Sequence, residues 1–201
     1  MASSGSKKET PTTHLFIKNM VCPRCIKVIR DEFARLGLDI RSITLGEVVV
    51  SGIISSGEMK SVQKVLEENG FELLEDKRAR LIERIKIEII SMVNEDHTDG
   101  RESLTARLKK TVSQDYVYIS SLFSAVENIT IEQFYIQQKI EKVKELLKYN
   151  ELSLSEIAWR LGYSSVQHLS SQFRKITGLT PTEFKSAGKR SSGENSHQNH
   201  P

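Results

Sequence analysis

The feature that most constrains the fold of this chain is an internal repeat in its C-terminal half. When the 201-residue sequence is shifted by 50 residues, the segment from Ser103 aligns with the segment from Ser153 without a gap. The identical pairs include Ser103/Ser153, Leu104/Leu154, Ser120/Ser170, Ser121/Ser171, Phe123/Phe173, Thr130/Thr180 and Phe134/Phe184. Apolar character also matches, at Ile119/Leu169, Val126/Ile176 and Ile129/Leu179. The two copies are therefore expected to bury the same helix faces.

The second copy reads as two helices joined by a tight turn. Ser153 is a candidate N-cap, and Glu156 completes a capping box. The turn falls at 162–164, and the next helix is predicted over 165–177. That helix is expected to bury one face and expose the other, with Val166, Leu169, Phe173 and Ile176 inside and Gln167, His168, Ser171, Arg174 and Lys175 outside.

The exposed face of this helix suits contact with DNA. Gln can form two hydrogen bonds with adenine, Ser and His can meet base edges, and Lys or Arg can neutralise phosphates. A helical hairpin with an ordinary solvated face has the same pattern, however. A net charge of +3 permits nucleic-acid binding without demonstrating it. The pattern alone leaves both interpretations open.

Residues 154–185, LSEIAWRLGYSSVQHLSSQFRKITGLTPTEFK, resemble the second helix-turn-helix of AraC-family transcriptional regulators. The segment before them, YIQQKIEKVKELL, resembles the family's linker helix, with Lys139 where Arg is more usual. The resemblance covers roughly 80–187, and the first repeat copy is the more degenerate one. The matching positions are Ile157, Ala158, Leu161, Gly162, Tyr163, Leu169, Phe173, Arg174, Lys175, Gly178, Thr180 and Pro181.

The resemblance implies a bacterial, sequence-specific regulator of transcription rather than an enzyme. Its partner is double-stranded promoter DNA, with two recognition helices in successive major grooves and RNA polymerase as a candidate protein partner. By position, the base-contacting candidates are Gln167, His168, Ser171, Val117, Tyr118 and Ser121. The phosphate-contacting candidates are Lys109, Lys110, Arg174 and Lys175. Each of these residues can instead be an ordinary exposed helix position, and Val117 and Tyr118 can serve local packing.

The N-terminal part alternates between strand-like and helix-like segments. HLFIKNM reads as a strand, a helix follows over 25–36, and LDIRSITLGEVVVSG reads as a hairpin that turns at 45–46. A second helix ends at Gly70, and FELLE closes the unit as a strand. The order βαββαβ predicts a ferredoxin-like sheet with one face under two helices, which makes the whole chain α+β.

The two cysteines of the chain lie in NMVCPRCIK, between the first strand and the first helix of this unit. The segment resembles the metal loop Gly-Met-Thr-Cys-x-x-Cys of heavy-metal-associated domains, with Asn19 in place of Gly and Val21 in place of Thr. The resemblance implies that Cys22 and Cys25 bind Cu(I) or another soft ion, for which two thiolates suffice. No cofactor is required by this prediction. Zinc would need about two further ligands.

Two other interpretations of the cysteines remain open. The pair could undergo reversible oxidation, although the N-terminal unit lacks the proline that follows the cysteines in a thioredoxin-like unit. The pair could also be inert in a domain that no longer binds metal. The corresponding alternative function is a metallochaperone or thiol-redox module whose helical half binds a protein.

The predicted organisation has five parts. They are a disordered tail at 1–11, a heavy-metal-associated-like domain at 12–76, a linking helix and loop at 77–102, an AraC-type DNA-binding domain at 103–186 and a disordered tail at 187–201. The sequence contains neither an apolar stretch of about 20 residues nor a secretory signal pattern, so we expect a cytoplasmic protein without a membrane span. The oligomeric state is left open.

Overall fold

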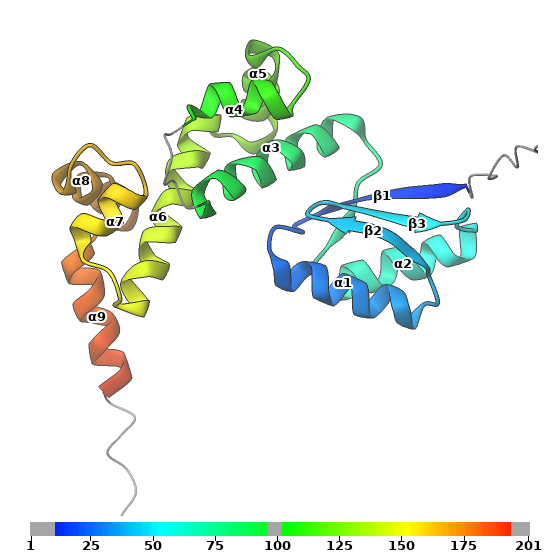
Figure 1. The fold of residues 1–201 in the computed structure, drawn as a ribbon, viewed down its shortest axis with the longest axis horizontal. Helices are drawn as coiled ribbons and strands as arrows, with labels where there is room; N and C mark the ends of the chain where they lie inside the picture. The colour runs from blue at the N-terminus through cyan, green and yellow to red at the C-terminus, as the bar shows by residue number, and fades with distance from the viewer. Residues whose placement is uncertain (1–10, 96–101, 194–201) are drawn as a thin grey trace, which may run out of the picture. The chain divides into compact units, whose positions relative to one another are not determined.

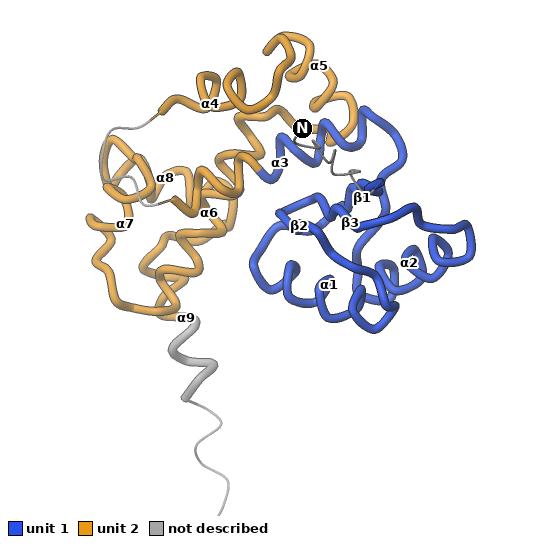
Figure 2. Tube along the Cα trace, turned by 45° about the vertical axis from the view of Figure 1, so that its right-hand side comes forward, with its two compact units in different colours: residues 1–87 blue, residues 88–201 orange. Residues whose placement is uncertain are grey.

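The computed structural model describes residues 11–95 and 102–193, with side chains described up to residue 187. It divides into two compact units, 1–87 and 88–201, coloured separately in Figure 2. The division falls inside helix α3 (Lys77–Asn94), between the boundaries at 76 and 103 that the sequence predicts. The predicted tail at 1–11 lies almost wholly outside the described residues. Helix α9 extends to Gly193 and so continues past the predicted start of the C-terminal tail.

The N-terminal unit has the predicted order of strands and helices. Its four strands form an antiparallel sheet in the order β2-β3-β1-β4, and α1 and α2 cover one face of it (Figure 1). The last strand is shorter than FELLE suggested. The elements are β1 (Thr12–Lys18), α1 (Pro23–Arg35), β2 (Ile40–Thr44), β3 (Glu47–Ser51), α2 (Ser56–Glu68) and β4 (Glu72–Leu73).

The core of this unit lies between the sheet and its two helices. Alternate residues of the central strands, among them Leu15, Ile17, Val48 and Val50, are buried there against α1 and α2. The hairpin turn is at 45–46, as predicted. Gly46 has φ of 77°, and a Cβ at this position would overlap the side chain of Ile87 on α3. Glycine is therefore needed both for the turn and for the close approach of α3.

The C-terminal unit contains the last residues of α3 and six further helices among the described residues. The two helix pairs α4–α5 and α7–α8 each precede a longer helix (Figure 1). The helices are α4 (Leu104–Thr111), α5 (Tyr116–Glu127), α6 (Ile131–Tyr149), α7 (Leu154–Arg160), α8 (Val166–Thr177) and α9 (Pro181–Gly193).

The 50-residue repeat is reproduced in three dimensions. Ser103 and Ser153 accept capping hydrogen bonds at the starts of α4 and α7, and Asp115 and Ser165 do so for α5 and α8. The ring centroids of Phe123 and Phe134 lie 5.6 Å apart, and those of Phe173 and Phe184 are also 5.6 Å apart. Both pairs pack edge to face, which is the preferred geometry for aromatic rings. Each copy therefore ends with the same edge-to-face pair of phenylalanines.

One prediction from the repeat is wrong in part. Ile119, Phe123, Leu169 and Phe173 are buried as expected, whereas Val126, Ile176 and Leu179 are largely exposed. Val126 and Ile176 stand in the last turns of α5 and α8, three residues beyond the buried phenylalanines, where less of the unit covers the helix. Matched apolar character thus identified equivalent positions but not their burial.

Candidate nucleic-acid interface and thiol site

Helix α8 presents the predicted polar face. Leu169 and Phe173 are buried, while all five side chains predicted to lie outside are exposed: Gln167, His168, Ser171, Arg174 and Lys175. The helix begins at a Ser165 cap and ends at Gly178, whose φ of 79° suits a glycine stop. Gln167 and His168 thus lie in the first turn, where recognition helices contact bases, and the two cations lie in the last third of the helix.

The ring of His168 is held from two sides. Its Nδ1 lies 3.0 Å from Oγ of Ser164, and its ring packs edge to face against Tyr163 at 5.4 Å between centroids. Its backbone N–H donates to the Oγ of Ser165. These contacts leave Nε2 as the ring atom with which His168 can meet a base edge.

Tyr163, in the turn between α7 and α8, connects this histidine to α6. The ammonium group of Lys139 lies 3.8 Å from the ring centroid of Tyr163 and 5.5 Å from that of Tyr135. Lys139 is only 8% exposed, and the faces of the two rings stabilise its buried charge. The Tyr163 hydroxyl is buried without a hydrogen-bond partner, and burial raises the pKa of Tyr163 to about 12. The sequence interpretation missed this cluster, although Tyr135 one turn before Lys139 was a visible signal.

Helix α5 occupies the equivalent place in the first copy. Its candidate residues Val117, Tyr118 and Ser121 are all exposed, which argues against the packing interpretation of Val117 and Tyr118. Asp115 caps the helix by accepting from the backbone N–H groups of Val117 and Tyr118. The hydroxyl of Tyr116 donates a 2.6 Å hydrogen bond to Glu132 on α6.

The cationic candidates lie at the surface of both copies. Lys109 and Lys110 are exposed in the last turn of α4, as Arg174 and Lys175 are on α8. Arg107 on α4, by contrast, binds carboxylates: its guanidinium contacts Glu88 on α3 and lies 2.6 Å from Glu95. Hydrogen bonding to Glu88 raises the pKa of Arg107 further. Arg107 therefore anchors α4 to the end of α3.

Cys22 and Cys25 lie at the start of α1 as two free thiols. Their sulfurs are 3.1 Å apart, and both residues are half-buried. The hydrogen bond from Cys25 lowers the pKa of the Cys22 thiol, while desolvation raises the pKa of Cys25. Cys22 is thus the thiol that ionises first and the better initial ligand or nucleophile.

The loop before Cys22 shows why Asn19 can replace the glycine of the metal-loop pattern. Asn19 has φ of 68°, in the left-handed region that glycine favours and asparagine tolerates. Met20, which the pattern retains, is completely buried in the core of the unit. Both features maintain the course of the loop.

The thiol pair alone is the candidate metal site in this unit. Within 11–95 and 102–193, no group of three or more His, Cys, Asp or Glu side chains could hold a metal ion. Two thiolates match a soft two-coordinate ion and do not provide the four ligands of structural zinc. The sulfurs would have to separate to admit an ion, since a metal–sulfur bond is about 2.3 Å long for zinc.

A family model described as a helix-turn-helix domain matches residues 111–187. Over 86 residues the chain is 31% identical to the uncharacterised HTH-type transcriptional regulator YdiP of Escherichia coli, covering 42% of this chain and 28% of that protein. Over 98 residues it is 32% identical to the HTH-type transcriptional activator RhaR of Mannheimia succiniciproducens, covering 42% of this chain and 36% of that protein. This part of the chain is a helix-turn-helix domain.

The chain spans only part of the length of these relatives. The chain spans 28% and 36% of the lengths of the two regulators above. A solved structure, the C-terminal domain of the response regulator yesN from Fusobacterium nucleatum, is 28% identical with a TM-score of 0.41, covering 48% of this chain and 93% of that domain. The N-terminal unit lies outside the matched family region.

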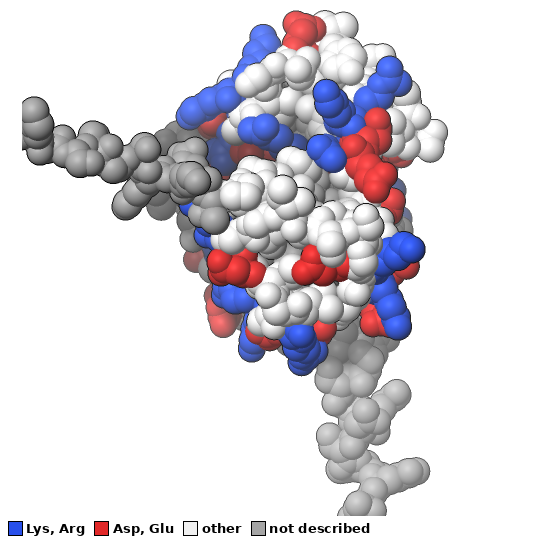
Figure 3. Space-filling view, turned by 90° about the vertical axis from the view of Figure 1, so that its right-hand side faces the viewer, with Lys and Arg blue, Asp and Glu red and all other residues white. Residues whose placement is uncertain are grey.

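One face of the molecule carries side chains of both charges. On the face that Figure 3 shows, Lys and Arg side chains are interspersed with Asp and Glu.

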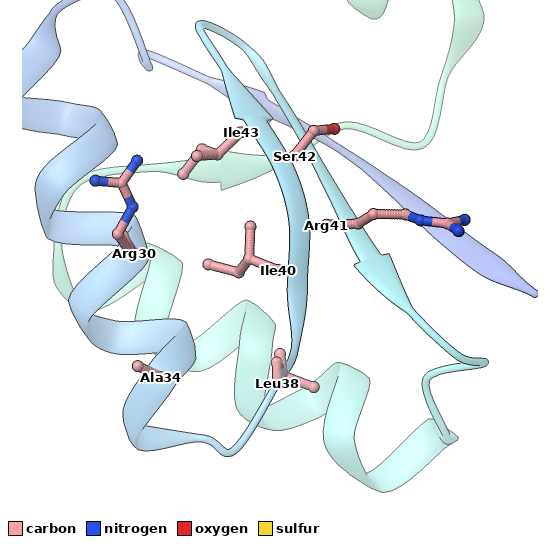
Figure 4. A pocket seen from close by; sticks show the side chains of 7 residues that line it. All are labelled: Arg30, Ala34, Leu38, Ile40, Arg41, Ser42 and Ile43. Carbon is pink, nitrogen blue, oxygen red and sulfur yellow. The ribbon is translucent and has the colours of Figure 1, made fainter. Parts of the chain in front are cut away.

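The N-terminal unit also has a pocket of about 620 Å³ between α1 and β2. Figure 4 shows Ile40 and Ile43 turned towards α1 and Arg41 turned away from it. Specific ligand sites combine apolar walls with several converging polar groups, and this lining offers chiefly apolar side chains with Arg30 beside them. We therefore place the candidate functions of the unit at the thiols. Across the part of the chain that the structure describes, no helix is long and apolar enough to cross a membrane.

Proposed function

We propose that the chain is a sequence-specific DNA-binding regulator of transcription. The observation that carries this proposal is the placement of two equivalent helices, α5 and α8, whose candidate base-contacting side chains are all exposed. Helices α5 and α8 both pack on α6, which has 19 residues and is therefore about 28 Å long. Successive major grooves on one face of DNA are about 34 Å apart, so one helix of this length suits a two-groove reader.

Each candidate residue has a role in this proposal. Gln167, His168 and Ser171 contact base edges from α8, and Val117, Tyr118 and Ser121 do so from α5. Phosphates are contacted by Lys109 and Lys110 on α4 and by Arg174 and Lys175 on α8. Ser121 and Ser171 are too short to form the bidentate Arg–guanine contact, so DNA shape carries part of the specificity.

The test compares base-reading and phosphate-contacting variants on DNA selected by the full chain from a random pool. Gln167→Ala should reduce discrimination at one base pair by about 1–3 kcal/mol, while Lys175→Ala should weaken binding to all sequences and lower the salt slope by about 1. Fluorescence polarisation at several salt concentrations measures both. Equal losses on selected and random DNA for Gln167→Ala would reject its base-reading role. Absence of binding by the parent at about 100 mM salt would reject the function.

We propose that the N-terminal unit is a ferredoxin-like, heavy-metal-associated-like domain that responds to a soft metal ion. Its strand order, its CxxC pair at a helix start and the left-handed conformation of Asn19 support this proposal. Cys22 and Cys25 would hold the ion. Its binding would change the charge and the conformation of the loop between β1 and α1. Metal binding can change DNA occupancy only if the metal-free and the metal-bound chain have different affinities for DNA.

Titration with Cu(I) against a competing chelator, with DNA affinity measured before and after loading, tests this second proposal. Loading should change DNA affinity in the parent and leave it unchanged in Cys22→Ser/Cys25→Ser. If that variant binds Cu(I) and DNA as the parent does, the sensing proposal fails. Cu(I) binding without DNA binding would instead favour a metallochaperone whose helical half binds a protein.

A further inference from the structure

The two recognition helices carry different chemistry at equivalent positions. Where α8 has Gln167 and His168, α5 has Val117 and Tyr118. Where α8 has Arg174 and Lys175, α5 has Ser124 and Ala125. The sequence of α5 contains no Lys, Arg, His or Asp, and its one Glu is Glu127. The helix therefore lacks both the amide that bonds adenine and the cations that neutralise phosphates.

The apolar side chains of α5 are exposed at the place where bases would be met. Val117 is 76% exposed and Tyr118 is 47% exposed, although Ile119 and Phe123 on the same helix are completely buried. Helix α5 thus packs into the core through Ile119 and Phe123, and Val117 takes no part in this packing. Both exposed residues stand in the first turn, directly after the Asp115 cap, which is the part of a recognition helix that enters the groove.

One apolar group is available to such a helix in the major groove, the C5 methyl of thymine. We propose that α5 recognises thymine methyl groups through Val117 and Tyr118, whereas α8 recognises hydrogen-bonding groups through Gln167 and His168. Each half of the operator is then read by a different chemistry. This inference rests on the proposed DNA-binding function and adds the kind of base that one half of the site must contain.

The affinity of the α5 half depends on apolar contact more than that of the α8 half. Helix α5 has no cation of its own, and the helix before it, α4, has Lys109 and Lys110 in its last turn. Removing one contacted methyl group should weaken binding about fourfold, the equivalent of about 0.8 kcal/mol for a buried methyl. The same removal under α8 should have little effect.

The experiment replaces thymine by deoxyuridine, which lacks the C5 methyl, in one half of the selected site at a time. The full chain should lose about fourfold in affinity per contacted thymine in the α5 half, with little change in the α8 half. Val117→Ser should abolish this sensitivity to deoxyuridine. Val126→Ser is the matched control, because Val126 is a 51% exposed valine near the other end of α5, and it should retain the sensitivity.

Three results would overturn the inference. If the parent binds selected DNA but deoxyuridine has no effect in either half, the methyl reading is wrong while the DNA-binding function stands. Suppose instead that Val117→Ser leaves the deoxyuridine effect intact and lowers the mass of the sedimenting species from that of an oligomer to that of a monomer. The exposed apolar residues of α5 then mediate self-association and do not read thymine. If the parent binds no DNA at all, the inference falls with the proposed function.

Discussion

The backbone N–H of Asn19 donates a 2.8 Å hydrogen bond to the carboxylate of Glu83, which connects the loop before the cysteines to helix α3. Glu83 is only 4% exposed, and Lys86 lies 3.5 Å from its second oxygen. The carbonyl of Asn19 lies 3.8 Å from the sulfur of Cys25, close enough for a weak S–H hydrogen bond. The two backbone groups of Asn19 thus contact the thiol of Cys25 on one side and helix α3 on the other.

Glu83→Ala should loosen this loop. The substitution removes the acceptor of the Asn19 N–H, which should cost about 1–3 kcal/mol of local stability. Amide hydrogen exchange at 19–26 measures the loss. Arg84→Ala, at an exposed neighbour on the same helix, is the control and should change exchange little. Unchanged protection in Glu83→Ala would show that the hydrogen bond does not hold the loop.

Arg107→Ala should detach α4 from the end of α3. The guanidinium binds Glu88 and Glu95 and remains 24% exposed, so we expect a loss on the order of 1–2 kcal/mol, below the value for a buried charged hydrogen bond. Arg107→Lys should restore part of it, because one ammonium group cannot reproduce the planar fork. Urea unfolding followed by circular dichroism gives the values. Equal stability of Arg107→Ala and the control Lys109→Ala would contradict the anchoring role.

Tyr163→Phe should be neutral or slightly stabilising at neutral pH, because the hydroxyl is buried without a partner while the ring remains against Lys139. Tyr149→Phe, at an exposed tyrosine, serves as the control here and in the alkaline experiment that follows. A clear loss of stability at pH 7 in Tyr163→Phe would reveal a partner for the hydroxyl.

The same substitution should change the response to alkaline pH. Burial raises the pKa of Tyr163 from 10.0 to about 12, so the unfolded chain releases this proton before the folded chain does. Unfolding then releases a proton between these two values, and stability falls as the pH rises from 10 to 12. Unfolding curves in this range should fall less steeply for Tyr163→Phe than for the parent. Identical slopes would mean that Tyr163 ionises normally in the folded chain.

Phe123→Ala and Phe173→Ala should destabilise the C-terminal unit by similar amounts, about 3–5 kcal/mol each. Both side chains are completely buried, and each packs edge to face on one partner ring at the same distance. Thermal unfolding of the two variants tests whether the copies are energetically equivalent. A loss in one variant several times that in the other would show that the repeat is equivalent in geometry only.

The sequence predicted those features that depend on local pattern. The Ser153 cap, the turn at 162–164 and the burial of Leu169 and Phe173 on α8 each follow from residues a few positions apart, and the structure has them as expected. The same holds for the βαββαβ order and the hairpin turn at Gly46. The exposed candidates on α8 follow from helical periodicity, and those on α5 were placed by the family resemblance. The contact of both sets with DNA remains a prediction.

Features that depend on distant packing were missed. The linking helix predicted within 77–102 did not reveal that Glu83 is buried, because its partner, Asn19, lies 64 residues away. The charge of Arg107 gave no sign that it binds Glu88 and not phosphate. Lys139 appeared to be an ordinary replacement for Arg, and only the fold brings its ammonium group over the ring of Tyr163. Long-range partners of charged residues follow no short periodic pattern.

Hydroxyl-radical footprinting of the full chain on its selected DNA tests the central claim most directly. A reader with α5 and α8 in successive major grooves should protect two patches on one face of the duplex, about one helical turn apart. Val117→Ser should weaken protection in one patch, and Gln167→Ala in the other. A single patch, or protection that neither substitution changes, would contradict a two-helix reader of DNA.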